Sequence, residues 1–195
     1  MNKDYKKIVE TTLKILDKKP WHDITLKEIQ SKSKVKKFNL LIKSKKDLLI
    51  KLNNYFDYKV SSKISNIENS NYKDMIFEVI MMRFDVLQEN RKGIISIFNS
   101  FKSRPKLLFF LLPELLDSIL IMVKSINLPI KGVLGQLKIK GIFFIYISSF
   151  FVWLNDETIA LDKTMTALDK YLDQANNIIK FITARICLFI RLSHV

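Results

Sequence analysis

The chain has 195 residues, of which 48% are hydrophobic, and it contains only 4 glycines and 4 prolines. An all-β fold needs a turn signal roughly every 8–12 residues, so this scarcity excludes one and predicts an all-α protein. The 33 basic residues against 19 acidic ones leave a formal net charge of +14. This charge favours a polyanionic partner, either nucleic acid or an anionic membrane surface. Because Lys, Asn, Ile and Phe are all abundant, as A+T-rich coding would give, the location of the charge says more than its sum.

The positive charge is concentrated at the start of the chain. Residues 1–51 contain 15 Lys and 6 acidic residues, a net charge of +9. Residues 152–183 contain 3 basic and 5 acidic residues, a net charge of −2. A compositional bias alone would spread the lysines evenly. The asymmetry predicts a basic head at residues 1–50 and a more neutral helical body at residues 51–195.

The head divides into short predicted helices. A first helix ends near residues 18–21, where Lys-Lys-Pro-Trp interrupts the apolar spacing. Two capping-box patterns, Thr25–Glu28 and Ser44–Asp47, predict where a second and a fourth helix begin. Between them, Val35–Ile42 has the spacing of a third, short helix with its apolar residues facing inward. The four segments together predict three helices braced by the start of a fourth.

This succession has the layout of a helix-turn-helix, in which a second helix follows a tight turn and enters the DNA major groove. Lysines at both ends of the third segment can neutralise phosphates, and an asparagine within it can read an adenine edge. The candidate DNA-binding residues are therefore Lys34, Lys36, Lys37, Asn39, Lys45 and Lys46. The alternative is a solvated, lysine-rich face on a helical hairpin with no DNA partner.

The body reads as further helices, and the last of them has the most regular pattern in the chain. Its apolar residues alternate spacings of four and three, a heptad rhythm that keeps one seam against another helix. Such a seam packs either within the chain or between two copies, and its length favours a homodimer. The predicted interface residues are Leu161, Met165, Leu168, Leu172, Ile179 and Ile182. Earlier in the body, Pro113 is expected to kink or divide a helix that begins near Pro105.

The body also has more aromatic side chains than a helical bundle needs for packing. An apolar, aromatic lining would suit an isoprenoid or acyl chain, so an apolar small molecule or lipid is a possible ligand. The alternative is ordinary core packing. The candidate ligand-binding residues are Phe84, Phe98, Phe101, Phe143 and Phe144.

Enzyme chemistry has no support in the sequence, so we expect no catalytic residue, metal or cofactor. The two histidines, His22 and His194, stand near opposite ends without metal-ligand spacing. The single Cys187 excludes a disulfide framework. The first residues lack the apolar core of a signal peptide. The most apolar run, residues 141–154, is shorter than the roughly 20 residues of a spanning helix, so we expect a cytoplasmic protein without a transmembrane segment.

At the head, Ile8–Leu49 resembles the DNA-binding domain of the TetR family of bacterial repressors. Lys19–Trp21 stands where that family has an Arg/Lys-Gly-aromatic turn, and Ser44–Leu49 is similar to its "sKxxLL" fourth-helix start. The resemblance implies a TetR-like transcriptional regulator with a three-helix head on a helical bundle, in which Thr25 and Lys45 touch phosphates. Two differences stand out. Ser33–Val35 replaces the family's Ala-Gly-Val turn, and the recognition segment is about two residues shorter.

The body carries a second resemblance. Tyr72–Leu87 is similar to a segment of alphaproteobacterial TetR-like proteins. Val152–Glu157 followed by Lys163–Asp169 is similar to their "WLxD…TMxxLD" signature, shared with a TetR-derived accessory family of ubiquinone biosynthesis that binds lipid and not DNA. The resemblance thus implies a regulator that responds to an apolar small ligand. The alternative is a lipid-binding accessory protein of ubiquinone biosynthesis at the membrane surface.

Overall fold

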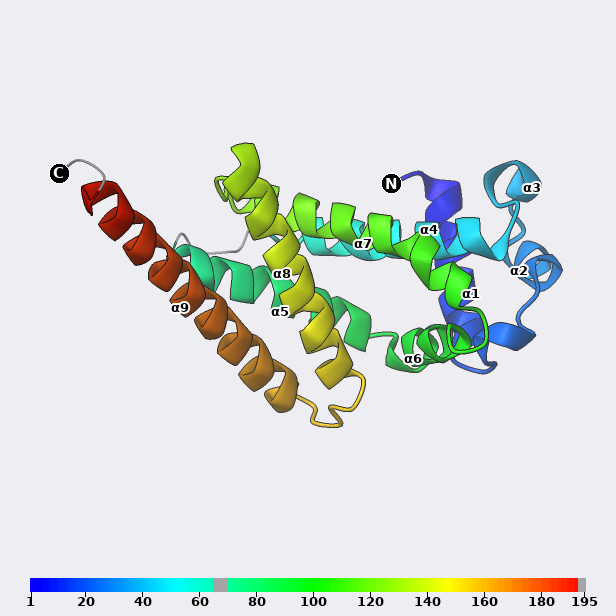
Figure 1. The fold of residues 1–195 in the computed structure, drawn as a ribbon. Coiled ribbons are helices and arrows are strands. Elements are labelled where there is room, and N and C mark those ends of the chain that lie inside the picture. Colours follow the sequence, from blue (N-terminus) through cyan, green and yellow to red (C-terminus); the bar gives the residue numbers. More distant parts are fainter. Residues whose placement is uncertain (65–69, 193–195) are drawn as a thin grey trace. The chain divides into compact units, whose positions relative to one another are not determined.

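The computed structural model of the protein describes the backbone of residues 1–64 and 70–192, and side chains up to residue 178 apart from that gap. Within these residues every regular element is helical, which confirms the all-α prediction (Figure 1). The elements are α1 (Lys3–Leu16), the 3-10 helix η1 (Trp21–Asp23), α2 (Leu26–Ser33), α3 (Phe38–Leu41), α4 (Lys45–Ser61), α5 (Tyr72–Gln88), α6 (Arg91–Ser100), α7 (Pro105–Ser125), α8 (Gly132–Trp153) and α9 (Asp162–Leu192).

The chain folds into two compact units. Unit 1 comprises Met1–Ile67 and Val79–Leu128, and unit 2 comprises Glu68–Glu78 and Pro129–Val195. Helix α5 contributes its first turns to unit 2 and its remainder to unit 1. The boundary predicted at residue 50 falls inside α4, so the head shares one compact unit with α4, α6 and α7.

The head is packed on α4 and α6 through α1. Figure 1 shows α4 and α7 side by side, and α1 contacts α2, α4 and α6. The apolar face of α1 is buried as its spacing predicts, including Ile8 and Leu13. Gly93 lets α6 approach α1 closely, because a Cβ at that position would lie 3.0 Å from the Cβ of Leu16. These contacts place the head on a helical support.

The two predicted capping residues begin their helices as expected. Thr25 accepts a hydrogen bond from the backbone N–H of Glu28 at 3.2 Å, and Ser44 caps α4 in the same way. The Glu28 carboxylate does not reach back to the cap. It accepts hydrogen bonds from Lys32 at 2.9 Å and Lys19 at 3.0 Å, and these lower the pKa of Glu28. The cap of α2 is therefore one-sided, and Glu28 ties α2 to the end of α1.

Two long helices form the middle of the body. Helix α7 continues through Pro113 as one element of 21 residues, so Pro113 does not divide it. Helix α8 begins at Gly132 and has 22 residues, so it starts well before the apolar run at residues 141–154. Its second glycine, Gly135, is required by the turn before it, since a Cβ there would lie 2.0 Å from the carbonyl carbon of Ile130.

A buried network of charged and polar side chains joins three helices of unit 1. Arg83 on α5 is 1% exposed and pairs with Asp57 on α4. Its guanidinium also donates to the amide oxygen of Asn53 at 2.8 Å. Ser118 on α7 is fully buried and donates to Asp57 at 2.9 Å. Because an unpaired charge in a core costs several kcal/mol, this network sets the register of α4 against α5 and α7.

Unit 2 is built on the packing of α8 against α9 (Figure 1). Lys73 near the start of α5 donates to the carboxylates of Asp169 at 2.8 Å and Asp173 at 2.7 Å, one turn apart on α9. These hydrogen bonds raise the pKa of Lys73. The first turns of α5 are thereby tied to α9.

The loop between α8 and α9 is organised by one buried carboxylate. Asp156 is fully buried and accepts hydrogen bonds from the backbone N–H and the hydroxyl of Thr158, at 3.1 and 2.6 Å. It also accepts from the backbone N–H and the hydroxyl of Thr164, at 2.8 and 2.7 Å. Burial by itself raises the pKa of Asp156, but the four hydrogen bonds outweigh it and lower the pKa to about 2. Asp156 and Thr158 both accept hydrogen bonds from backbone N–H groups in the first turn of α9 and so cap it.

We predict that Arg83→Met reduces the free energy of unfolding by about 3–5 kcal/mol, because it leaves the Asp57 carboxylate buried without its cation. Urea denaturation followed by circular dichroism at 222 nm would measure the loss. The control is Lys63→Met, which removes a surface ion pair to Glu89 with Nζ and Oε1 3.6 Å apart and should cost less than about 1 kcal/mol. The double variant Arg83→Met, Asp57→Leu should recover stability. If Arg83→Met and Lys63→Met reduced the free energy of unfolding equally, the assignment of Arg83 and Asp57 as a buried pair would be contradicted.

We predict that Asp156→Asn reduces stability at pH 7 by at least about 2 kcal/mol, because hydrogen bonds to a buried charge are lost. The pKa of Asp156 is lower in the folded chain than its ordinary 3.8. Its stabilisation is therefore present above pH 4 and disappears as the pH falls towards 2. Denaturation curves of wild type and variant should converge over that range. The exposed neighbour substitution Glu157→Gln should change neither curve, and a pH-independent gap would contradict the assignment.

Candidate nucleic-acid interface

The turn between α2 and α3 is built on Lys34. This residue has a φ of 52°, in the left-handed region, and its N–H closes α2 on the carbonyl of Gln30 at 3.1 Å. Glycine reaches this conformation without strain, which is why the resembling family has glycine here. The chain therefore keeps the helix-turn-helix turn with a lysine in the position of a glycine.

Helix α3 is held from beneath by three buried side chains. Val35, Phe38 and Ile42 are 6%, 1% and 1% exposed. The helix itself has only four residues, Phe38–Leu41, shorter than the predicted Val35–Ile42, and Lys36 and Lys37 belong to the preceding turn. A helix this short has little stability of its own, so its orientation is set by these anchors.

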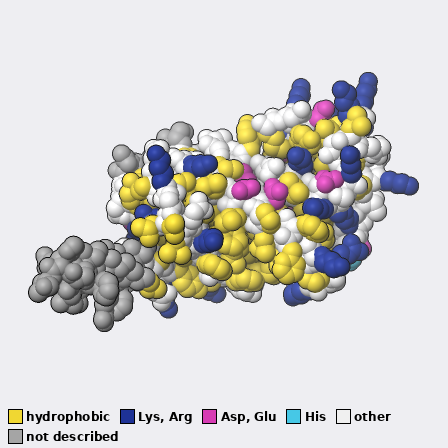
Figure 2. Space-filling view, turned by 45° about the horizontal axis from the view of Figure 1, so that its top comes forward, with side chains coloured by type: hydrophobic (Ala, Val, Ile, Leu, Met, Phe, Trp, Pro, Cys, Tyr) yellow, Lys and Arg dark blue, Asp and Glu magenta, His cyan; other side chains and the backbone are white. Residues whose placement is uncertain are grey.

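The opposite side of this segment is basic and solvent-exposed. Lys34, Lys36, Lys37 and Asn39 are all exposed, and no acidic residue occurs between Glu28 and Asp47. Figure 2 shows Lys and Arg side chains projecting from the head, at the right of the view. The structure thus leaves four of the predicted DNA-binding residues solvent-exposed in one short basic segment, and Thr25 at the start of α2 is exposed as well.

Lys45, at the start of α4, lies differently. Its ammonium donates to the carbonyl oxygen of Trp21 at 2.8 Å and to that of His22 at 3.3 Å, and it lies 5.2 Å from the centre of the indole ring of Trp21. Burial, followed by repulsion from Arg104, lowers the pKa of Lys45. An ammonium has three N–H donors, so one remains for a phosphate oxygen. Lys45 is first of all a brace between α4 and η1.

The sequence did not indicate how η1 is held. Trp21 is 2% exposed, and its backbone N–H donates to the hydroxyl of Ser96 on α6 at 2.7 Å. Lys46 lies with its ammonium 3.7 Å from the ring centre of Phe110 on α7. Both contacts join residues far apart in the chain. The head is therefore fastened to α4, α6 and α7 at several points.

The five candidate ligand-binding phenylalanines do not form one group. Phe84, Phe98 and Phe101 belong to unit 1, where Phe84 is fully buried and the rings of Phe98 and Phe101 meet edge to face. Phe143 and Phe144 belong to unit 2, and Phe144 is 68% exposed. The structure therefore places part of the predicted set in a core and part on a surface.

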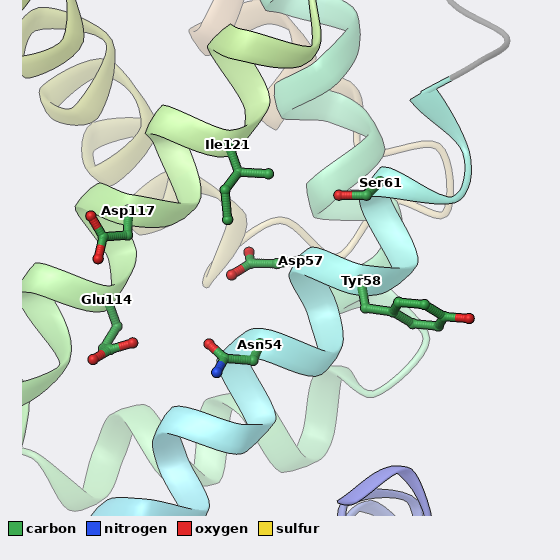
Figure 3. A pocket seen from close by; sticks show the side chains of 7 residues that line it. All are labelled: Asn54, Asp57, Tyr58, Ser61, Glu114, Asp117 and Ile121. Carbon is green, nitrogen blue, oxygen red and sulfur yellow. The ribbon is translucent and has the colours of Figure 1, made fainter. Parts of the chain in front are cut away.

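A groove of about 400 Å³ does occur in unit 1, but most of the residues that line it carry polar or charged side chains. Figure 3 shows Asp57 on α4 facing Glu114 and Asp117 on α7, with Ile121 above them. Asp57 is already paired with Arg83. Three carboxylates in its lining do not suit an acyl chain or isoprenoid, so the groove differs from the apolar pocket expected from the sequence.

The predicted dimer seam also divides. Leu161, Leu168 and Leu172 are 1%, 0% and 5% exposed within a single chain. These leucines pack inside unit 2, which corrects their assignment to a surface between two copies. Met165 is exposed. The side chains of Ile179 and Ile182 lie outside the described residues.

An exposed apolar face runs along α8 instead. Its large members recur at helical spacing, and the smaller Gly141 and Ser148, which are also exposed, stand between them. The large members are Val133, Leu134, Leu137, Phe144 and Phe151, which are 52% to 86% exposed. Within the described part of the chain, α8 is also the one helix long and apolar enough to span a membrane, a test that core helices of soluble proteins pass as well. The four-and-three spacing from Leu137 to Phe151 could have been found in the sequence.

Comparison with known proteins identifies the fold. The structure is similar to the crystal structure of the TetR transcriptional regulator from Nitrosomonas europaea ATCC 19718, with a TM-score of 0.72 and 18% sequence identity. The match covers 90% of this chain and 99% of that one. No protein-family model matches the sequence, and no curated protein does either. The chain therefore has a TetR-like all-helical fold.

Proposed function

We propose that the protein is a TetR-like transcriptional regulator that binds DNA through the surface of α2 and α3. The observation that carries the proposal is the exposed basic segment Lys34–Asn39, presented by three buried anchors and free of acidic residues. The similar protein from Nitrosomonas europaea is described as a TetR transcriptional regulator. The net charge of +9 on residues 1–51 adds long-range attraction to phosphate.

We further propose that the protein acts as a homodimer, joined through the exposed apolar face of α8. A helix of a soluble domain buries its apolar stripe, and exposed apolar patches of this kind mark interaction sites. The alternation of large residues with Gly141 and Ser148 would let two copies of α8 approach closely. Two heads on one dimer can then contact two half-sites of an operator.

An apolar small molecule is the third part of the proposal, and it acts by shifting the separation of the two heads. Its support is the aromatic content of the body, including the edge-to-face pair of Phe98 and Phe101. Native mass spectrometry of the purified protein should show a co-purifying apolar molecule. If no apolar molecule co-purifies and neither a C16 fatty acid nor farnesol raises the melting temperature, the ligand proposal is contradicted. The proposals on DNA binding and dimerisation would be unaffected.

We predict specific, salt-dependent binding to DNA flanking the protein's own gene. The logarithm of the association constant should fall linearly with the logarithm of the salt concentration. Lys36→Ala and Lys37→Ala should each make this slope less steep by about 0.9 per head. Fluorescence anisotropy with a labelled duplex and unlabelled competitor would measure both. Lys45→Met is the contrasting variant, because its ammonium is bound to the carbonyls of Trp21 and His22. Lys45→Met should lower the melting temperature of the protein and change the salt slope less than Lys36→Ala or Lys37→Ala does.

Two outcomes, one from this assay and one from a parallel vesicle-binding assay, would contradict the regulator proposal. If competitor DNA of any sequence displaces the labelled duplex equally well, the protein forms no specific complex and binds DNA only through its positive charge. Retention on vesicles of phosphatidylcholine and phosphatidylglycerol, without specific DNA binding, would favour the alternative of a lipid-binding accessory protein of ubiquinone biosynthesis at a membrane surface.

We predict that Phe144→Asp converts the dimer to a monomer and abolishes paired half-site binding, because it buries a charge in the centre of the interface. Sedimentation equilibrium would give the mass. Ile159→Asp is the matched control, since Ile159 is 99% exposed in the loop before α9, and the variant should remain dimeric. A wild-type mass of one chain, or a dimer unaffected by Phe144→Asp, would overturn this interface.

A further inference from the structure

One exposed residue of the recognition segment has no use in phosphate binding. Leu40 on α3 is 75% exposed, although leucine is a residue that folding normally buries. It lies within four residues of Lys36 and Lys37, which are exposed in the turn before α3. Asn39 is its exposed neighbour. The exposed side chains of this segment are therefore basic in the turn before α3 and uncharged within the helix.

Leu40 does not contribute to holding α3 in place. The three anchors beneath the helix, Val35, Phe38 and Ile42, are buried, and Leu40 lies on the opposite side. A leucine cannot bind a phosphate, and its exposure brings no gain to folding. A function for it requires an apolar surface that lies between phosphates.

The DNA major groove presents one such surface, the C5-methyl group of thymine. The flanking lysines can each reach a phosphate, which would seat the centre of the segment over the base edges. An asparagine at the next position can pair with adenine through its N6 and N7 atoms. Leucine and asparagine side by side thus match the two halves of an A·T pair.

We infer that Leu40 is a specificity-determining residue that contacts a thymine methyl group in the major groove, so that the protein prefers A·T pairs at the centre of each half-site. The inference rests on the proposed DNA-binding function. It adds an apolar readout to the electrostatic one, and it assigns Leu40 a role that the lysines cannot have. The lysines set affinity and its salt dependence, and Leu40 with Asn39 selects the sequence.

The test uses a duplex selected by the wild-type protein from a pool randomised over 20 base pairs. Each thymine of the selected half-site is replaced in turn by deoxyuridine, which lacks only the methyl group. At the contacted position wild-type affinity should fall about fourfold, the value of one buried methyl-sized group. Leu40→Ala should lose the same factor on the thymine duplex and be insensitive to the replacement. Ile159→Ala, altered at an exposed position outside the head, should behave as wild type.

The outcomes separate the two levels of the inference. If a sequence is selected and wild type binds every uracil-substituted duplex as tightly as the thymine duplex, the Leu40 inference is overturned and DNA recognition stands. If Leu40→Ala keeps the wild-type sensitivity to uracil, another residue reads the methyl and the inference fails. If the pool yields no enriched sequence, both the proposed regulator function and this inference are overturned. Circular dichroism of Leu40→Ala should match wild type, because the residue is exposed.

Discussion

The position of the head depends on a buried ion pair far from it in the sequence. Arg83 and Asp57 are almost wholly excluded from water, and Asn53 and Ser118 form further hydrogen bonds with them. A buried charge tolerates few arrangements, because each alternative register of the helices would leave it unpaired. Helix α4, which carries both Asn53 and Asp57, is thereby fixed against α5 and α7. The first residue of α4 is Lys45, which follows the cap Ser44 a few residues after the end of α3.

From that fixed helix the head is built outward by smaller contacts. Lys45 ties the first turn of α4 to the backbone of η1, and Ser96 ties η1 to α6. Gly93 allows α6 to lie against α1. Each of these interactions contributes little free energy by itself, but each joins two elements that are distant in the chain. Helix α3 has only four residues, so it keeps one orientation because the surrounding helices hold it.

Helices α8 and α9 show how one pattern can serve two surfaces. The heptad spacing at the start of α9 buries Leu161, Leu168 and Leu172 inside a single chain, and α9 packs against α8. The same kind of spacing on the outer side of α8 leaves Phe144 and its neighbours in contact with solvent. In the proposed dimer the inner seam stabilises the unit, and the outer face joins two units. The buried carboxylate of Asp156 fixes the loop through which the chain passes from one helix to the other.

The sequence by itself determined the helical class, the order of the helices, the caps at Thr25 and Ser44, and the basic character of the head. All of these follow from local spacing, local propensity and charge, which act between residues close in the chain. Tertiary structure alone decided which leucines of α9 are internal, that Lys45 braces η1, and that Leu40 is left exposed. It also decided the pairing of Arg83 with Asp57, 26 residues apart. A sequence pattern gives the side of a helix that is apolar, but the neighbour that covers it is chosen only when distant segments pack together.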